Sequence, residues 1–271
     1  KVLLYQDKFA EAASALDNVI GVYSLVSDYG SQFLRFGENG PESVFEIQYS
    51  NQSNWYDWGC AHCSEGNYAI IMNGPRGWSG PEYAQGWSFN VPTEEFYNSF
   101  EEGDSRRDAT VLDIEAFAAA TGASYTEGYD HTGYFNNKYI PRAGESGGQT
   151  ELNYLTNFRI IRYSDVLLMA AEAYNRGGID DGLAQEFLNQ VRRRAFGGDD
   201  NDISASGSAL TDAIWEERKF ELSLEGHRFF DLVRTGRASS LIAGFVEGKH
   251  EVFPIPQQEV DISGLTQNAG Y

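Results

Sequence analysis

Residues 216–236 read EERKFELSLEGHRFFDLVRTG, a run in which charged and aromatic side chains are interleaved with leucine and valine. The run predicts a helix from about Ser208 to Glu225 and a shorter helix after Gly226, because glycine commonly ends a helix. Arginine can bind a carboxylate through two parallel hydrogen bonds, so these charges suit ion pairs between packed helices. We therefore predict structural roles, rather than ligand binding, for Arg218, Glu225, His227, Arg228 and Asp231.

The expected partners of the arginines are acidic residues of the same region. We expect Arg218, Arg228 and Arg234 to form semi-buried clusters with carboxylates chosen from Glu172, Glu221, Glu225 and Asp231. Removing one partner of such a cluster leaves a buried charge, at a cost of about 3–5 kcal/mol.

Apolar residues at helical spacing predict further helices upstream. One apolar face runs from Tyr163 to Tyr174 and stops at Gly177-Gly178, and a second runs from Ala184 to Ala195. Another stripe covers residues 2–20. Small alanines at this spacing are typical of tetratricopeptide-type hairpins. The sequence therefore predicts a mainly α-helical fold of tetratricopeptide-like hairpins.

The middle of the chain follows a different pattern. Residues 43–49 alternate like a strand, and a long stretch rich in Gly, Asn, Ser, Pro, Trp and Tyr follows without periodicity. Four of the five Trp residues lie in that stretch, which indicates packing or binding rather than disorder. We divide the chain, as one structural domain, into a helical-repeat segment (1–27), a loop-rich insertion with short strands (28–157) and a helical C-terminal segment (158–271).

Composition excludes two classes of partner. The 271 residues include 40 Asp and Glu against 20 Lys and Arg, giving a net charge of −20, which repels a phosphate backbone and disfavours nucleic acid. No apolar stretch is long enough to span a bilayer. The first residue is Lys1 and no secretion signal follows it, so we expect a fragment or processed form.

The two cysteines, Cys60 and Cys63, form a Cys-x-x-Cys pair. Their flanks are rich in loop residues and lack the strand-to-helix context of a redox dithiol, and no second pair or His spacing suits zinc. A local disulfide and free thiols both stay open, and we expect no metal and no cofactor.

Catalytic signatures are absent from the sequence. It contains no nucleophile elbow, zinc-binding His-Glu-x-x-His, Walker loop or dinucleotide fingerprint. His227 lies close to Asp231, but we interpret this run as a helix junction with satisfied charges. The chain is therefore not expected to be an enzyme.

Several motifs, taken in order, resemble the signatures of the SusD/RagB family of outer-membrane nutrient-binding lipoproteins of Bacteroidetes. Besides 216–236, RYSDVLLMAAEA (162–173) resembles the family's R-Y-A-D-V-L-L-x-x-A-E-A, and LNQVRRRA (188–195) resembles L-N-x-V-R-x-R-A. The endings FPIPQQE (253–259) and LTQNAGY (265–271) are similar to P-I-P-x-x-E and Q-N-P-G-Y, with Ala269 in place of the usual proline. Further landmarks are residues 42–49, 86–93 and 104–107.

This resemblance implies a SusD-like α/α fold and a function at the cell surface. It implies non-catalytic binding of an oligosaccharide or polysaccharide and its delivery to a SusC-like TonB-dependent outer-membrane transporter. It also implies that this chain is the C-terminal portion of a longer protein. Contact with the outer membrane would come only from an N-terminal lipid anchor upstream.

The aromatic loop is the expected ligand site. Sugar rings stack on flat aromatic faces, while amides and guanidinium groups bind sugar hydroxyls, and rigid aromatics lose little entropy on binding. On this chemistry we predict ligand contacts for Trp55, Trp58, Trp78, Tyr83, Arg76 and Asn54. We expect Trp87, inside one of the landmarks, to belong to the core.

Two alternatives come from other functional classes. A glycoside hydrolase could use two of the many carboxylates, although nothing in the sequence places two of them across a cleft. A helical-repeat scaffold could bind only protein. An exposed row of aromatic residues in the loop would favour glycan over that scaffold.

Overall fold

The computed structural model describes residues 1–52, 58–146 and 152–271, with only the main chain for Trp58, Ala61 and His62. Contacts divide the chain into two compact units, residues 1–225 and 226–271. The predicted segment boundaries near 27 and 157 both fall inside the first unit.

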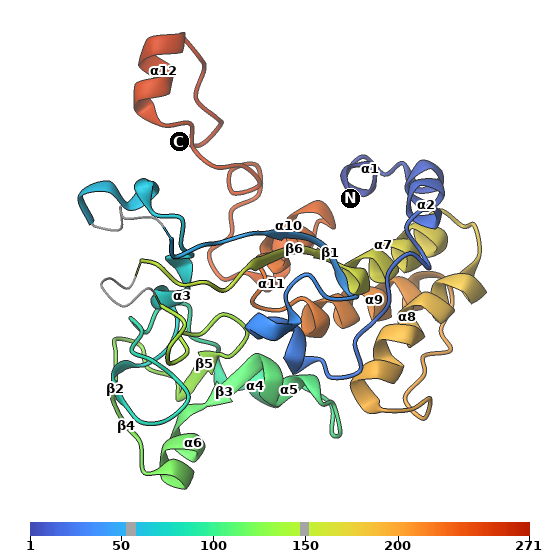
Figure 1. Ribbon diagram of the computed structural model, residues 1–271. Coiled ribbons are helices and arrows are strands. Elements are labelled where there is room, and N and C mark those ends of the chain that lie inside the picture. Colours follow the sequence, from blue (N-terminus) through green and yellow to red (C-terminus); the bar gives the residue numbers. More distant parts are fainter. Residues whose placement is uncertain (53–57, 147–151) are drawn as a thin grey trace. The chain divides into compact units, whose positions relative to one another are not determined.

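The helical part of the first unit is built around α7 (Tyr163–Arg176), which is buried on nearly all sides. Its neighbours are α2 (Phe9–Asp17), α8 (Asp181–Phe196) and α9 (Gly207–Glu221). The Asp180 side chain caps α8 by accepting a hydrogen bond from the Leu183 N–H (3.0 Å), and α8 ends at Gly197. Figure 1 shows α8 and α9 beside α7. Buried Leu, Ala and Val side chains of these helices make up much of the main core. The predicted helix-rich fold is confirmed, while the tetratricopeptide-like arrangement stays a prediction.

Two predicted helix boundaries are wrong. The stripe over residues 2–20 is two helices, α1 (Val2–Tyr5) and α2, because Asp7 between them has a left-handed φ of 53° that no α-helix accommodates. The helix predicted to reach Glu225 is α9, which ends at Glu221. Leu224 has a φ of 62°, so the chain turns before Gly226.

Within the described residues, the loop-rich part forms antiparallel two-stranded ribbons. β1 (Ser43–Ile47) pairs with β6 (Phe158–Arg162), β2 (Arg76–Ser79) with β4 (Ser124–Thr126), and β3 (Val111–Asp113) with β5 (Tyr134–Asn136). The strand predicted at 43–49 is therefore confirmed as β1. In Figure 1 the ribbon β1–β6 lies between the helices α7 to α9 and the smaller ribbons.

Short helical segments complete the loop-rich part. They are η1 (Gly30–Phe33), η2 (Arg35–Gly37), η3 (Trp58–Cys63), α3 (Ala69–Met72), α4 (Glu94–Asn98), α5 (Arg106–Thr110) and α6 (Ile114–Thr121). Two small cores support them, one around Phe33, Ile70 and Tyr139 and the other around Tyr83, Ile114 and Phe135.

The second unit contains α10 (Arg228–Arg234), α11 (Ala238–Leu241) and α12 (Gln257–Ser263). Among the described residues of both units, no helix combines the length and apolar character that crossing a membrane requires.

Candidate functional site

The ribbon β2–β4 holds Trp78 in a half-buried position. Its ring packs against Tyr83 (centroids 6.0 Å apart) and against Phe117 of α6 (5.9 Å). A Cβ on Gly80 would overlap Ala123 and come within 2.8 Å of the indole, so glycine is what leaves room for this ring. The indole Nε1 is buried and has no hydrogen-bond partner among the described residues. Trp78 is thus a rigidly seated aromatic with only part of its surface open to solvent.

Tyr83 lies in the core beneath Trp78 and is only 5% exposed. Its hydroxyl donates to the Asn137 side-chain oxygen (3.2 Å), and the Arg142 guanidinium lies 5.3 Å from its ring centroid. Burial, the first cause, and the Glu82 carboxylate raise the pKa of Tyr83. In this arrangement the Tyr83 ring supports Trp78 and presents little surface of its own.

Arg76 is exposed and lies beside an aromatic ring that sequence analysis did not select. Its Nε donates to the Trp87 carbonyl (2.8 Å), and its guanidinium lies 5.8 Å from the centroid of Phe89. Phe89 is 54% exposed, whereas Trp87 is partly buried against the core, as expected. The pair of Arg76 and Phe89 places a guanidinium next to an open aromatic ring.

The loop that carries Phe89 is tied tightly to α3. The N–H groups of Trp87, Ser88 and Phe89 each donate at 2.9 Å, to the carbonyls of Ile71, Gly74 and Met72. A Cβ on Gly86 would overlap the Asn73 carbonyl oxygen, so the close approach requires glycine. The exposed ring of Phe89 is therefore preorganised.

The remaining predicted ligand residues cannot be placed. Asn54 and Trp55 lie outside the described residues, and only the main chain of Trp58 is described, within η3. Of the predicted set, the structure brings Trp78 and Tyr83 together and places Arg76 on the same ribbon as Trp78. In η3, Cys60 and Cys63 are joined by a disulfide, which resolves the choice between disulfide and free thiols.

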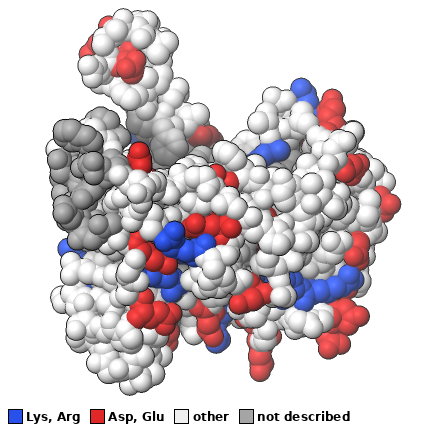
Figure 2. All heavy atoms as spheres, viewed as in Figure 1, with Lys and Arg blue, Asp and Glu red and all other residues white. Residues whose placement is uncertain are grey.

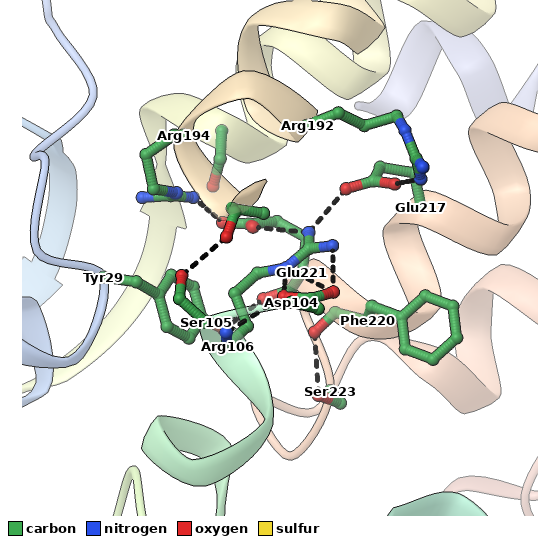
Figure 3. A network of polar contacts seen from close by, with 12 residues as sticks. Tyr29, Asp104, Ser105, Arg106, Arg192, Arg194, Glu217, Phe220, Glu221 and Ser223 are labelled. Atoms are coloured by element: carbon green, nitrogen blue, oxygen red, sulfur yellow. Dashed lines mark hydrogen bonds and ion pairs between the residues drawn. The ribbon is translucent and has the colours of Figure 1, made fainter. Parts of the chain in front are cut away.

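A buried ion network connects the loop-rich part to the helices. Arg106 of α5 is fully buried and binds Asp104 (2.7 Å), Glu217 (2.5 Å) and Glu221 (3.1 Å), as Figure 3 shows. Arg194 of α8 binds the other oxygen of Glu221 (2.6 Å). Residues far apart in the chain thus meet at the end of α9.

The network extends through Arg162 at the end of β6. Its guanidinium binds Glu42 (2.6 Å), Glu221 (2.9 Å) and Glu225 (2.8 Å), and Lys138 also binds Glu225 (2.7 Å). Burial lowers the pKa of Lys138 to about 8, against the attraction of Glu225. Burial alone would raise the pKa of Glu221, but Arg194, Arg162 and Arg106 outweigh it and hold that pKa well below its usual value.

The motif at residues 216–236 contributes to the network and to further ion pairs. Glu225 is buried in the network, Asp231 binds Arg234 (2.8 Å) within α10, and Arg218 donates to Asp165 (2.7 Å). Asp165 is not among the partners expected from the sequence. His227 and Arg228 are half-buried at the start of α10. Arg106, Lys138, Arg162 and Arg194 were not predicted as members of the network. The sequence offered two signals for them, the landmark from Asp104 to Arg107 and the arginines at 162 and 192–194.

Charge is dispersed over the face of the molecule seen in Figure 2. Figure 2 shows carboxylates at many places on the visible face, with most visible Lys and Arg groups beside them. Across residues 1–52, 58–146 and 152–271, no group of three or more His, Cys, Asp or Glu is arranged to hold a metal ion.

The chain is similar to proteins of one family along its whole length. The model of the SusD family matches residues 41–245. A solved structure described as a laminarin-binding SusD-like protein is 39% identical, with a TM-score of 0.88 over 100% of this chain and 60% of that one. Surface glycan-binding protein A from Bacteroides thetaiotaomicron, in complex with laminarihexaose, is 33% identical, with a TM-score of 0.87 over 98% of this chain and 61% of that one.

A curated relative gives the same result. SusD-like protein P2 of Formosa agariphila is 28% identical over 255 residues, which make up 85% of this chain and 48% of that protein. The chain therefore spans about half the length of this relative. Since the family model covers most of the chain, and solved relatives match it from end to end, the chain belongs to the SusD family.

Proposed function

We propose that this chain binds a glycan through the loop surface formed by Trp78, Arg76 and Phe89. The observation that carries the proposal is the exposed ring of Phe89, held in place by the loop and flanked by the Arg76 guanidinium. Such a pair offers a flat apolar face for a sugar ring and a donor for its hydroxyls. The earlier predictions for Trp55, Trp58, Asn54 and Tyr83 remain part of this proposal, with Tyr83 as a support for Trp78.

The proposed ligand is a neutral glucan of the laminarin type. Two similar proteins support this choice, one described as laminarin-binding and one solved with laminarihexaose. A net charge of −20 disfavours polyanionic glycans, which agrees with a neutral ligand.

The role in the cell is proposed on the same basis. The chain would bind glycan at the outer-membrane surface, as part of a lipid-anchored protein, and pass it unchanged to a SusC-like TonB-dependent transporter. Co-purification with such a transporter from membranes of the source cells tests this partner.

Affinity electrophoresis tests the binding itself. The protein should be retarded in gels that contain laminarin and should migrate unchanged in gels that contain alginate. Equal migration in both gels would contradict the proposal. Incubation with laminarin followed by analysis of reducing ends tests the alternative of a glycoside hydrolase, and released product would support that alternative.

A further inference from the structure

A groove outside the aromatic loops lies between the extended segment 23–27 and α8. Its volume is about 540 Å³, within the range of about 300–1,000 Å³ that is typical of small-molecule sites. Its lining includes Tyr23, Leu25, Tyr163, Gln190 and Arg193. None of these residues belongs to the loop surface proposed above.

One wall of the groove is a segment anchored by hydrogen bonds. The Ser24 N–H donates to the Pro41 carbonyl (3.1 Å), and the Val26 N–H donates to the Glu42 carboxylate (3.0 Å). The Val26 carbonyl accepts a hydrogen bond from Arg194 of α8 (3.5 Å). This wall of the groove is therefore fixed in place, both to the residues before β1 and to α8.

An aromatic ring lies at one end of the same wall. Tyr23 is half-exposed, and its ring lies 6.3 Å from that of buried Tyr163, whose hydroxyl accepts a hydrogen bond from the Gly21 N–H (2.9 Å). Tyr23 is therefore held against a fixed partner, with part of its ring open to the groove.

The charges on the opposite wall are already balanced. Arg193 binds both Glu186 (3.1 Å) and Asp202 (2.5 Å), while Arg194 binds Glu42 and Glu221. Each guanidinium faces two carboxylates, so the groove has no excess positive charge for an anion. The Gln190 side chain adds a neutral amide that donates to Glu186 (3.2 Å).

We propose that this groove is a second glycan-contact site, which takes a short segment of neutral oligosaccharide. A partly open aromatic ring and a neutral amide match the apolar faces and hydroxyls of a sugar, and the balanced charges give no preference for anions. The inference rests on the proposed function, since it assigns the second site to the same class of ligand.

Calorimetric titration with laminarihexaose tests this site, using Tyr23→Ala and Gln190→Ala in the groove, Phe89→Ala in the loops and Val22→Ala as a control. Val22 is 67% exposed and does not line the groove. Melting temperatures are recorded for each variant, because Tyr23 also packs on Tyr163. We expect two bound hexaoses per wild-type chain, one after Tyr23→Ala, one after Phe89→Ala, and two after Val22→Ala. Gln190→Ala should weaken one of the two binding events several-fold.

The outcomes separate the two proposals. A single binding event that Phe89→Ala removes and the groove variants leave unchanged would overturn the second site and leave the loop site intact. A single event that only the groove variants remove would support the groove and contradict the loop site. No binding of laminarihexaose by the wild-type protein would overturn both.

Discussion

The buried ion network and the loop surface use the same residue types for opposite purposes. Arg162 and Arg106 are enclosed by carboxylates, and neither has capacity left for a ligand. The Arg76 side chain, in contrast, donates to the Trp87 carbonyl and lies exposed against Phe89. Whether an arginine of this protein stabilises the fold or is available to a ligand therefore depends on its burial and its partners. The arginines of the family motif at 216–236 belong to the stabilising group.

The largest effect is expected from Arg162→Ala. The change leaves Glu42, Glu221 and Glu225 without their shared cation, and removing one partner of a buried ion pair costs about 3–5 kcal/mol. Urea denaturation should show this loss in the free energy of unfolding.

The matched control is Arg107→Ala, because Arg107 is exposed and its ion pair is with neighbouring, exposed Asp108. Its guanidinium also lies 5.0 Å from the centroid of the Tyr97 ring. It should cost less than about 1 kcal/mol. Equal losses for the two variants would contradict the structural role of the network.

The second-largest effect on stability is expected from acid, which should weaken the ion network. The pKa of Glu221 is depressed in the folded protein relative to its ordinary value of 4.5. Its ionisation therefore stabilises the fold above pH 4.5, and this contribution is lost as the pH falls below that value. Urea denaturation between pH 7 and pH 3 should show a falling midpoint below about pH 4.5. A constant midpoint across that range would refute the depressed pKa.

Trp78→Ala should affect both stability and binding, because the Trp78 ring is packed against its neighbours and also partly open to solvent. Loss of its contacts with Tyr83 and Phe117 should cost about 2 kcal/mol, less than for a fully buried ring. Laminarin retention should also fall. Trp78→Phe should restore the free energy of unfolding more fully than it restores retention on laminarin. If both returned to wild-type levels, a ligand contact by the indole would be contradicted.

Arg76→Ala should have the smallest effect on stability and a clear effect on binding. One lost charge-assisted hydrogen bond of about 1.4 kcal/mol corresponds to about tenfold weaker binding of laminarihexaose. The melting temperature should stay within about 2 °C of the wild type, since the residue is exposed. A large drop in melting temperature with unchanged affinity would place Arg76 with the structural arginines instead.

Local patterns predicted the helices well, because helical spacing and terminal glycines are local signals. The apolar face ending at Gly177-Gly178 and the one ending at Gly197 correspond to α7 and α8. The network could not be predicted, because its partners are distant in the chain. Arg162 and Glu42 are 120 residues apart, and Arg106 and Glu221 are 115 residues apart.

The sequence could suggest candidate site residues but not their surroundings, because residue type does not report exposure. Arg76 is exposed, Tyr83 is buried, and Phe89 was overlooked inside a family landmark. Phe89 lies between Ser88 and Asn90, which both have left-handed backbone conformations. The exposure of its ring depends on this loop conformation, which the sequence alone does not indicate.

Calorimetry of laminarihexaose binding by wild type, Phe89→Ala and Phe36→Ala tests the loop surface most directly. Phe36 is 78% exposed on η2 and lies outside that surface, so it controls for the loss of any exposed ring. We predict that Phe89→Ala weakens or removes one binding event at an unchanged melting temperature, while Phe36→Ala binds like the wild type. Wild-type affinity in Phe89→Ala, or equal losses in both variants, would contradict glycan binding at the loops.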